Sequence, residues 1–215
     1  MDSSYLVDLA FYIPLLPALV AIWKYPLLNN HQKWFAILLW VIIIISFTGD
    51  FWFRSTGRNN MPFFHLYILA EYLIFIKIFQ LMFADSIRAT IWIFLACSFL
   101  IIWLMNVFIG EGWWGFPDYI HALEALVILS LIFIWFSKML QERKILHPER
   151  TFEFWMCAGL LIYFAGNFLL FLFPKFLIDA GPEIFNAIWK VTCILILLLY
   201  TFYTVALLWV RKTIK

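Results

Sequence analysis

Charged residues are scarce in this chain. Only 13% of its 215 residues are charged and 66% are hydrophobic, whereas a soluble domain is about a quarter charged and about half apolar. The mean hydropathy of +0.95 agrees with this composition, so a water-soluble globular protein is excluded. The net charge of +2 is spread over short clusters. The basic stripe of a nucleic-acid-binding protein is therefore missing, and no nucleic-acid partner is expected.

Cysteine is also rare, and the usual catalytic motifs are missing. The three cysteines, Cys97, Cys157 and Cys193, lie in apolar runs without a CxxC pair, so the sequence predicts neither disulfide bonds nor a zinc site. The segment Gly110-Glu111-Gly112-Trp113-Trp114-Gly115 matches GxGxxG literally, but it joins two apolar runs and follows no predicted strand. Dinucleotide binding fails that structural test. We expect no metal and no cofactor.

Long apolar runs are abundant. A helix needs about 20 mostly apolar residues to cross a bilayer, whereas a transmembrane barrel would alternate apolar and polar residues. The runs do not alternate, so they predict an all-α, polytopic membrane protein with a single domain over residues 1–215. We place seven transmembrane helices at about residues 5–23, 34–53, 63–83, 88–109, 118–140, 152–173 and 184–210. Pro14 and Pro17 are expected to kink the first helix.

The basic residues of the loops predict the orientation. Ten lie on one side of the predicted membrane and three on the other. Because basic residues stay cytoplasmic, we expect the N-terminus outside and the C-terminus inside, in a multi-pass protein of the cell membrane, with a bacterial inner membrane as the expected location. Membrane lipids are then its neighbours, and the basic inner loops are a candidate surface for a cytoplasmic protein partner. The inner group is Lys24, Lys33, Arg88, Lys138, Arg143, Lys144, Arg150, Arg211, Lys212 and Lys215, and the outer group is Arg54, Arg58 and Lys175.

Polar residues inside the spans are the candidate functional residues, because an intramembrane charge is unfavourable and usually faces the interior of the bundle. From the helical rise, Glu71 lies roughly 12 Å below the outer end of its span. Glu124, Lys190 and Asn167 lie roughly 9 Å below the outer ends of theirs. Each has a polar neighbour one turn earlier on the same face. They predict an outward-facing polar pocket for a small molecule, lined by Glu71, Glu124, Lys190, Asn167, Tyr67, His121, Tyr163 and Asn186.

The same residues allow a structural interpretation. Lys190 lies near the outer end of its helix, so its side chain either extends to the membrane surface or forms a buried ion pair with Glu71 or Glu124. Glu71 is accordingly either a structural partner or a group that holds a ligand or a proton. Glu124 and His121, three residues apart, form either a proton relay or a tie between helices. The pocket and the ion-paired core use the same side chains.

Three stretches carry a resemblance to a known family. They are Ile68-Leu69-Ala70-Glu71-Tyr72, the segment from Phe154-Trp155 through Gly159-Leu160-Leu161-Ile162-Tyr163-Phe164, and Leu199-Tyr200-Thr201. Over nearly the whole chain, the sequence resembles a family of small seven-helix integral membrane proteins from Bacteroidota. The resemblance implies seven spans and singles out Glu71. It implies no reaction, because that family has no assigned activity.

The expected function is binding or sensing of a small polar or amphipathic ligand in the predicted pocket. The alternative is an intramembrane enzyme acting on a lipid or isoprenoid, with a buried carboxylic acid as the general acid. In support of it, Ala70-Glu71-Tyr72-Leu73-Ile74-Phe75 is similar to the acidic motif of membrane lycopene cyclases. Proton or ion transport ranks lower, because it needs a polar layer through the inner half, where Lys77, Gln80 and hydroxyl groups are the main polar side chains.

Overall fold

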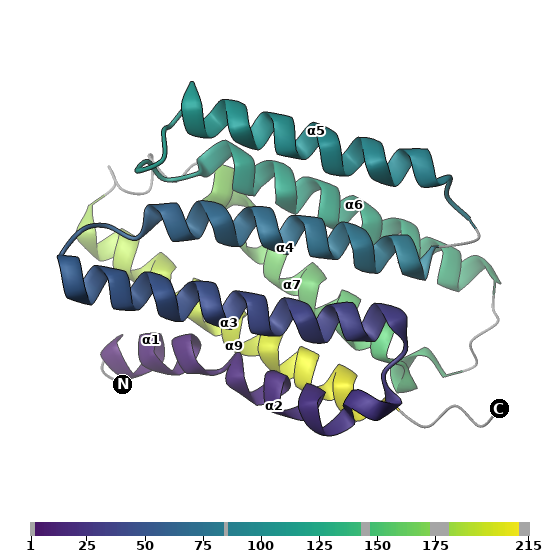
Figure 1. Ribbon diagram of the computed structural model, residues 1–215. Coiled ribbons are helices and arrows are strands. Elements are labelled where there is room, and N and C mark those ends of the chain that lie inside the picture. The colour runs from purple at the N-terminus through teal and green to yellow at the C-terminus, as the bar shows by residue number, and fades with distance from the viewer. Residues whose placement is uncertain (1–2, 84–85, 143–146, 173–180, 211–215) are drawn as a thin grey trace. The chain divides into compact units, whose positions relative to one another are not determined.

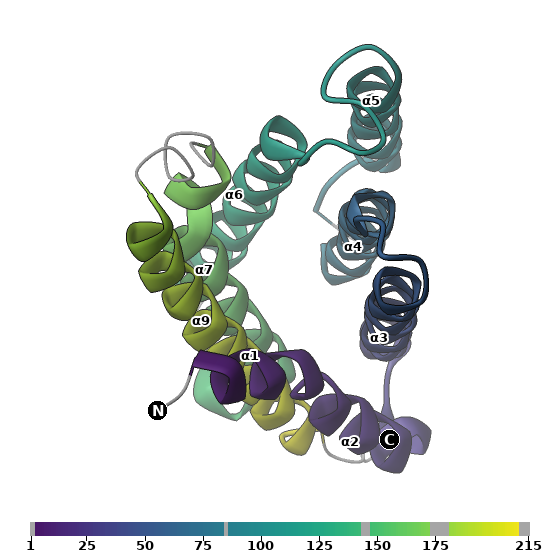
Figure 2. The same ribbon diagram turned by 90° about the vertical axis from the view of Figure 1, so that its left-hand side faces the viewer.

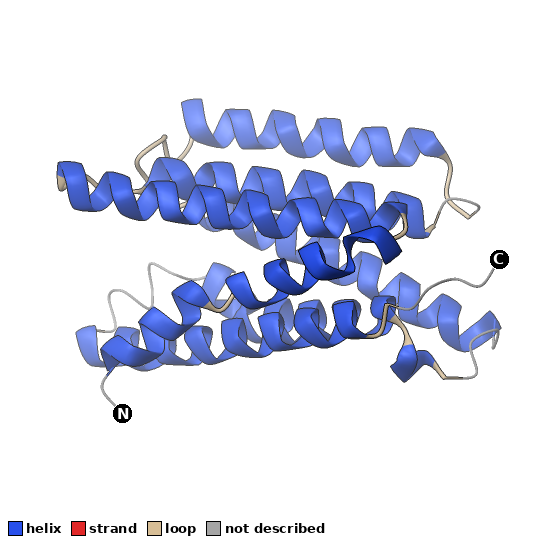
Figure 3. Ribbon diagram, turned by 60° about the horizontal axis from the view of Figure 1, so that its bottom comes forward, coloured by secondary structure: helices blue, strands red, loops and turns tan. Residues whose placement is uncertain are grey.

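Helices make up all the regular secondary structure that can be described. The computed structural model describes residues 3–83, 86–142, 147–172 and 181–210. Within these ranges there is no β-strand (Figure 3), which confirms the all-α prediction. Several basic loop residues used to predict the orientation lie outside the described ranges, namely Arg143, Lys144, Lys175, Arg211, Lys212 and Lys215.

The long helices have the length and composition of membrane spans. In the described ranges six are long and apolar enough to cross a bilayer, and a further apolar helix, Phe152–Phe168, is shorter. Large apolar side chains also remain exposed, such as Phe94 at 67% and Phe108 at 79%, as expected where lipid replaces water. The chain is therefore a multi-pass membrane protein. The long spans are Tyr5–Leu27, Asn30–Thr56, Met61–Met82, Ala89–Phe108, Asp118–Gln141 and Asn186–Leu208, close to the predicted positions.

The chain divides into two compact units. Unit 1 consists of Met1–Leu27 and Ala125–Lys215, and unit 2 consists of Leu28–Glu124. Helix α6 (Asp118–Glu142) contributes its first turns to unit 2 and the remainder to unit 1. The organisation of residues 1–215 as a single domain stays a prediction.

Unit 1 begins with a helix that is interrupted at a proline. Helix α1 (Ser3–Tyr12) ends and α2 (Leu15–Lys24) begins around Pro14, whose ring removes an amide donor and clashes with the carbonyl one turn earlier. The kink predicted at Pro14 is confirmed. Pro17 lies in the first turn of α2, where backbone amides have no intrahelical partner to lose. A short 3-10 turn, η1 (Tyr25–Leu27), follows α2.

Helices α7 (Phe152–Leu172) and α9 (Pro182–Leu208) pack closely in unit 1, and α1 and α2 lie along α9 (Figure 1). Two glycines of α7 permit this approach. A Cβ atom added at Gly159 would lie 2.8 Å from a side-chain atom of Phe202, and one at Gly166 would lie 2.8 Å from a methyl of Leu195. The helices meet there because no side chain of α7 separates them.

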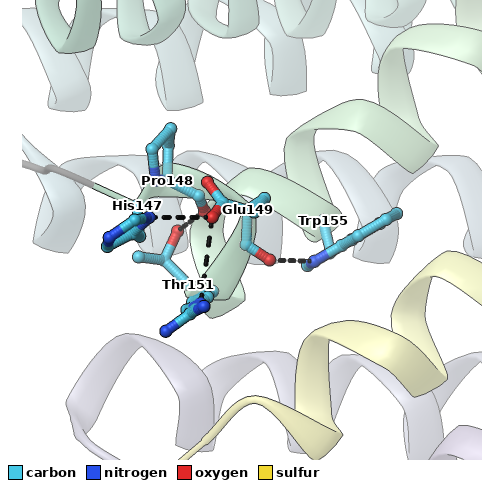
Figure 4. Close-up of polar contacts among 6 residues, drawn as sticks. His147, Pro148, Glu149, Thr151 and Trp155 are labelled. Atoms are coloured by element: carbon cyan, nitrogen blue, oxygen red, sulfur yellow. Dashed lines mark hydrogen bonds and ion pairs between the residues drawn. The ribbon is translucent and has the colours of Figure 1, made fainter.

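A 3-10 turn, η2 (Pro148–Arg150), leads into α7 (Figure 4). The side chains of Thr151 and Trp155 each donate a hydrogen bond of 2.7 Å to a carbonyl of this turn. The Glu149 carboxylate lies 3.9 Å from the guanidinium of Arg150. Arg150, one of the basic residues of the predicted inner loops, thus has an acidic partner within its own turn.

Unit 2 opens with α3 (Asn30–Thr56), whose ends are set by local hydrogen bonds. The Asn29 side chain accepts a bond from the Gln32 amide at 3.1 Å, and the Gln32 side chain accepts one from the Asn29 amide at 3.0 Å. This capping box starts the helix earlier than the predicted residue 34. At the other end Gly57, with φ of 67°, terminates the helix in the left-handed region.

Three helices of unit 2 lie side by side in the order α3, α4 (Met61–Met82), α5 (Ala89–Phe108), as the end-on view shows (Figure 2). A Cβ atom on Gly49 of α3 would lie 3.1 Å from the Cβ of Phe63 on α4, so α3 and α4 are in close contact at this point. Helix α4 is the central one of the three. It carries two of the predicted site residues, Tyr67 and Glu71.

Candidate functional site

Two acidic residues of unit 2 lie together in its interior. Glu71 is in the middle of α4 and Glu124 is in the second turn of α6. Glu71 is 2% exposed and Glu124 is 0% exposed, and their carboxyl groups lie close enough for the charges to interact. Two helices that are far apart in sequence therefore contribute to one buried acidic pair.

Tyr67 and His121 complete the group. The Tyr67 side chain, one turn before Glu71 on α4, hydrogen bonds to the Glu71 carboxyl group. The His121 Nε2 atom lies 3.8 Å from Oε2 of Glu124, which is too long for a hydrogen bond but close enough for electrostatic interaction. We call Tyr67, Glu71, His121 and Glu124 the acid cluster. It brings together half of the predicted site residues.

Hydrogen bonding in the acid cluster is incomplete. Among the residues described, no partner is found for Oε2 of Glu71 or for either carboxylate oxygen of Glu124. Tyr72 interacts electrostatically with Glu124, but its hydroxyl donates to the Leu95 carbonyl at 3.2 Å instead. A buried carboxyl without partners is strongly unfavourable. The cluster therefore requires a proton, a cation or a hydrogen-bond donor.

Aromatic rings line one side of the acid cluster. The Phe64 ring, two turns before Glu71 on α4, meets the His121 ring edge-to-face at a centroid distance of 5.4 Å. It also contacts the rings of Phe116 at 5.5 Å and Tyr67 at 6.0 Å. Phe64 and Phe116 thus form an aromatic wall against Tyr67 and His121. Such a wall can accept an alkyl chain or the face of a cation.

The loop of residues 109–117, between α5 and α6, is packed onto the first turns of α4. The His65 Nε2 atom and the Gly115 carbonyl are 3.1 Å apart, and the His65 ring stacks on Trp113 at 5.8 Å. Trp103 of α5 donates to the His65 carbonyl at 3.0 Å. The glycine-rich stretch that matches GxGxxG is therefore a packed connection between helices.

Asn167 and Tyr163, both predicted site residues, lie in unit 1. Asn167 is fully buried, and its Nδ2 donates to the Tyr163 carbonyl at 3.0 Å. Its Oδ1 accepts a hydrogen bond of 3.0 Å from the hydroxyl of Thr192 on α9. Asn167 thus ties α7 to α9. Thr192 was not predicted to take part, because nothing in the sequence marks it out from the other threonines.

The remaining two predicted site residues, Asn186 and Lys190, are exposed on α9. They are four residues apart and so lie on the same face of that helix. The exposure of Lys190 agrees with the interpretation in which its ammonium group extends to the membrane surface.

Two polar contacts elsewhere in unit 2 are made within a single helix. Lys77 donates to the side chain of Gln80, three residues later on α4, at 2.9 Å. Asp50 and Arg54 form an ion pair of 2.7 Å near the end of α3. These contacts satisfy the residues locally, in contrast to the carboxyl groups of the acid cluster.

Comparison with protein-family models, with curated proteins and with solved structures finds no match for this chain. The fold defines a class, a helical multi-pass membrane protein. The resemblance to the Bacteroidota family stays a prediction. Any assignment of function must therefore come from the chemistry of the acid cluster.

Proposed function

We propose that this chain is a seven-span membrane protein, with its N-terminus outside and its C-terminus inside, that binds a small polar or amphipathic ligand at the acid cluster. The ligand enters from the outer half of a bacterial inner membrane. The bound state is communicated to a cytoplasmic protein through the basic inner loops.

The observation that carries this proposal is the state of Glu124. This residue is 0% exposed and neither of its carboxylate oxygens has a hydrogen-bond partner in the described part of the chain. Ionisable residues in membrane interiors are unfavourable unless paired, and they commonly mark functional sites. A ligand with hydrogen-bond donors would supply the missing partners, and the aromatic wall around Phe64 would contact its apolar part.

The proposal is tested by comparing the small molecules that copurify with four proteins. These are the wild type, Glu71→Gln, Glu124→Gln and the control Glu183→Gln, each extracted from the same host membranes in a mild detergent. Glutamine preserves the size of the side chain and removes its charge. Glu183 is an exposed acid in the first turn of α9, so its substitution controls for loss of one negative charge.

We expect at least one species to copurify with the wild type and with Glu183→Gln, and to fall about tenfold or more in the two cluster variants. Removal of a charged hydrogen bond weakens binding by about 1.5–3 kcal/mol. Mass spectrometry of the extracts measures the ratio, and circular dichroism verifies that all four proteins are folded. The same set of small molecules in all four proteins would refute ligand binding at the acid cluster.

A further inference from the structure

The unsatisfied atoms of the acid cluster specify the chemistry of its ligand, on the premise that the proposed function is correct. At the two carboxyl groups, three oxygens have no hydrogen-bond partner among the described residues: Oε2 of Glu71 and both Oε1 and Oε2 of Glu124. All three are carboxyl oxygens, which accept hydrogen bonds and carry negative charge where the group is ionised. The ligand must therefore present positive charge, hydrogen-bond donors, or both. An anionic ligand would add a further negative charge to two interacting acids.

Among the described residues, no side-chain hydrogen bond reaches these three oxygens. The Tyr67 side chain bonds to the Glu71 carboxyl and still leaves Oε2 of that group unpaired. The Tyr72 hydroxyl is used by the Leu95 carbonyl at 3.2 Å. His121 Nε2 remains 3.8 Å from Glu124, beyond hydrogen-bonding distance. The missing hydrogen-bond donors must therefore come from another group, such as a ligand.

A metal ion is a poor candidate for the positive group that the acid cluster would bind. Hard cations such as Ca²⁺ take about six to eight oxygen ligands, and Mg²⁺ requires near-ideal octahedral geometry. Across residues 3–83, 86–142, 147–172 and 181–210, no group of three or more His, Cys, Asp or Glu side chains is placed to hold a metal ion. A positive group that carries its own N–H donors requires fewer protein ligands, because each donor satisfies one acceptor.

We propose that the acid cluster binds the primary ammonium group of an amphipathic amine. A primary ammonium has three N–H donors, which is the number of unpaired carboxylate oxygens at Glu71 and Glu124. The Phe64 ring lies against Tyr67 and His121, the other two members of the acid cluster, and offers an apolar surface for the carbon chain of the amine. A quaternary ammonium has the same charge but no N–H, so it leaves all three oxygens unpaired.

The same ammonium chemistry occurs in two sources, a soluble amine and the headgroup of an aminophospholipid. The experiment measures the thermal unfolding of purified protein in detergent, followed by tryptophan fluorescence. The soluble probes are hexylammonium and hexyltrimethylammonium. The lipid probes are phosphatidylethanolamine and phosphatidylcholine, added to the micelles at equal amounts. Each pair differs in the N–H donors while the positive charge is kept.

We expect hexylammonium or phosphatidylethanolamine to raise the unfolding temperature of the wild type by about 3 °C or more over its quaternary counterpart. A shift with hexylammonium alone identifies a soluble amine, and a shift with phosphatidylethanolamine alone identifies a lipid headgroup. The shift should persist in Glu183→Gln and disappear in Glu124→Gln. Glu71→Gln gives a second, independent loss if Glu124→Gln is unstable.

Two results would overturn the inference. One is an equal shift with primary and quaternary probes, since charge alone would then explain binding. The other is the absence of any shift, which would mean that the acid pair does not bind amines. If the copurification experiment also finds a species that depends on Glu71 and Glu124 but lacks an amine, the proposed function stands and the ammonium assignment falls. If it finds no such species, both fall.

Discussion

Buried polar side chains in this protein are of two kinds. Asn167 is fully buried and satisfied, with one hydrogen bond to Tyr163 of its own helix and one from Thr192 of α9. Glu124 is equally buried, but its oxygens find no partner in the described residues. The first kind stabilises helix packing, and the second still lacks hydrogen-bond donors. This contrast separates a structural residue from a candidate ligand-binding one better than depth in the membrane does.

The structural role of Asn167 is tested by replacing its partner. Thr192→Val keeps the shape of the side chain and leaves Oδ1 of Asn167 without its hydroxyl donor. We expect the free energy of unfolding to fall by about 0.6–1.7 kcal/mol, the range for hydrogen bonds between membrane helices. Unfolding of the purified protein by dodecyl sulfate, followed by circular dichroism, measures this change.

Thr201→Val is the matched control on the same helix. The Thr201 hydroxyl donates to the Leu197 carbonyl of α9 at 2.7 Å and is exposed, so its loss should change stability by less than about 0.5 kcal/mol. Equal effects of the two substitutions would show that the hydroxyl of Thr192 is not a specific tie between α7 and α9.

Periodicity and depth predicted part of the candidate site. Glu71 and Glu124 were predicted to line one pocket because both lie deep in apolar runs with a polar neighbour one turn earlier. The partner of Asn167 could not be predicted, because Thr192 meets it only when α7 packs against α9. A hydroxyl group in an apolar run is inexpensive, so the sequence does not distinguish Thr192 from the other threonines.

At the scale of helices, the ends and breaks follow from local chemistry. The interruption at Pro14 was predictable, since proline acts through its own backbone. The earlier start of α3 is determined by the capping residues Asn29 and Gln32. The search for apolar runs missed it because residues 30–33 are too polar to extend such a run. Hydropathy detects where lipid surrounds a helix, whereas capping determines where the helix begins.

The two glycines of α7 should differ in their tolerance of alanine. At Gly159 the added methyl meets the Cβ of Phe202, which is fixed to the backbone, so the helices must move apart. We expect Gly159→Ala to lower the free energy of unfolding by about 1–3 kcal/mol. At Gly166 it meets the end of the Leu195 side chain, which can rotate away. Gly166→Ala should therefore change stability by less than about 1 kcal/mol.

Dodecyl sulfate unfolding of both variants measures the difference. Because the glycines are seven residues apart, they lie on the same face of α7, and the comparison isolates the nature of the facing atom. A larger loss at Gly166 than at Gly159 would contradict the packing described for α7 and α9.

The loop of residues 109–117 should be held in place by Trp113 rather than by Trp114. Trp113 contacts the rings of His65 at 5.8 Å and Trp103 at 5.9 Å, whereas Trp114 is 50% exposed. Each aromatic contact is worth about 0.5–1.5 kcal/mol, so Trp113→Ala should speed amide hydrogen exchange in this loop by about tenfold. Trp114→Ala should leave it near the wild-type rate. Hydrogen-exchange mass spectrometry compares the two, and equal acceleration would argue against a specific clamp.

For the molecule as a whole, the composition predicted a helical membrane protein but not which helices pack together. The apolar runs located the helices because each run must match the thickness of a bilayer. Which helices pack together depends on small features such as Gly159 against Phe202, whose effect on average hydropathy is negligible. The division into units, with Glu71 and Glu124 in one and Asn167 and Lys190 in the other, was for this reason beyond the reach of the sequence pattern.

The proposed orientation has a direct test at two turns. Arg58 lies between α3 and α4, and Glu149 lies in η2 between α6 and α7. Three candidate spans, α4, α5 and α6, separate them; if each crosses the membrane, the two residues lie on opposite sides in either orientation. After replacement of Cys97, Cys157 and Cys193 by alanine, Arg58→Cys and Glu149→Cys are treated in intact cells with a membrane-impermeant maleimide. We expect labelling of Arg58→Cys only, because most basic loop residues are on the side of Glu149. Labelling of Glu149→Cys alone would reverse the orientation, and equal labelling of both would mean that one of the three helices does not cross.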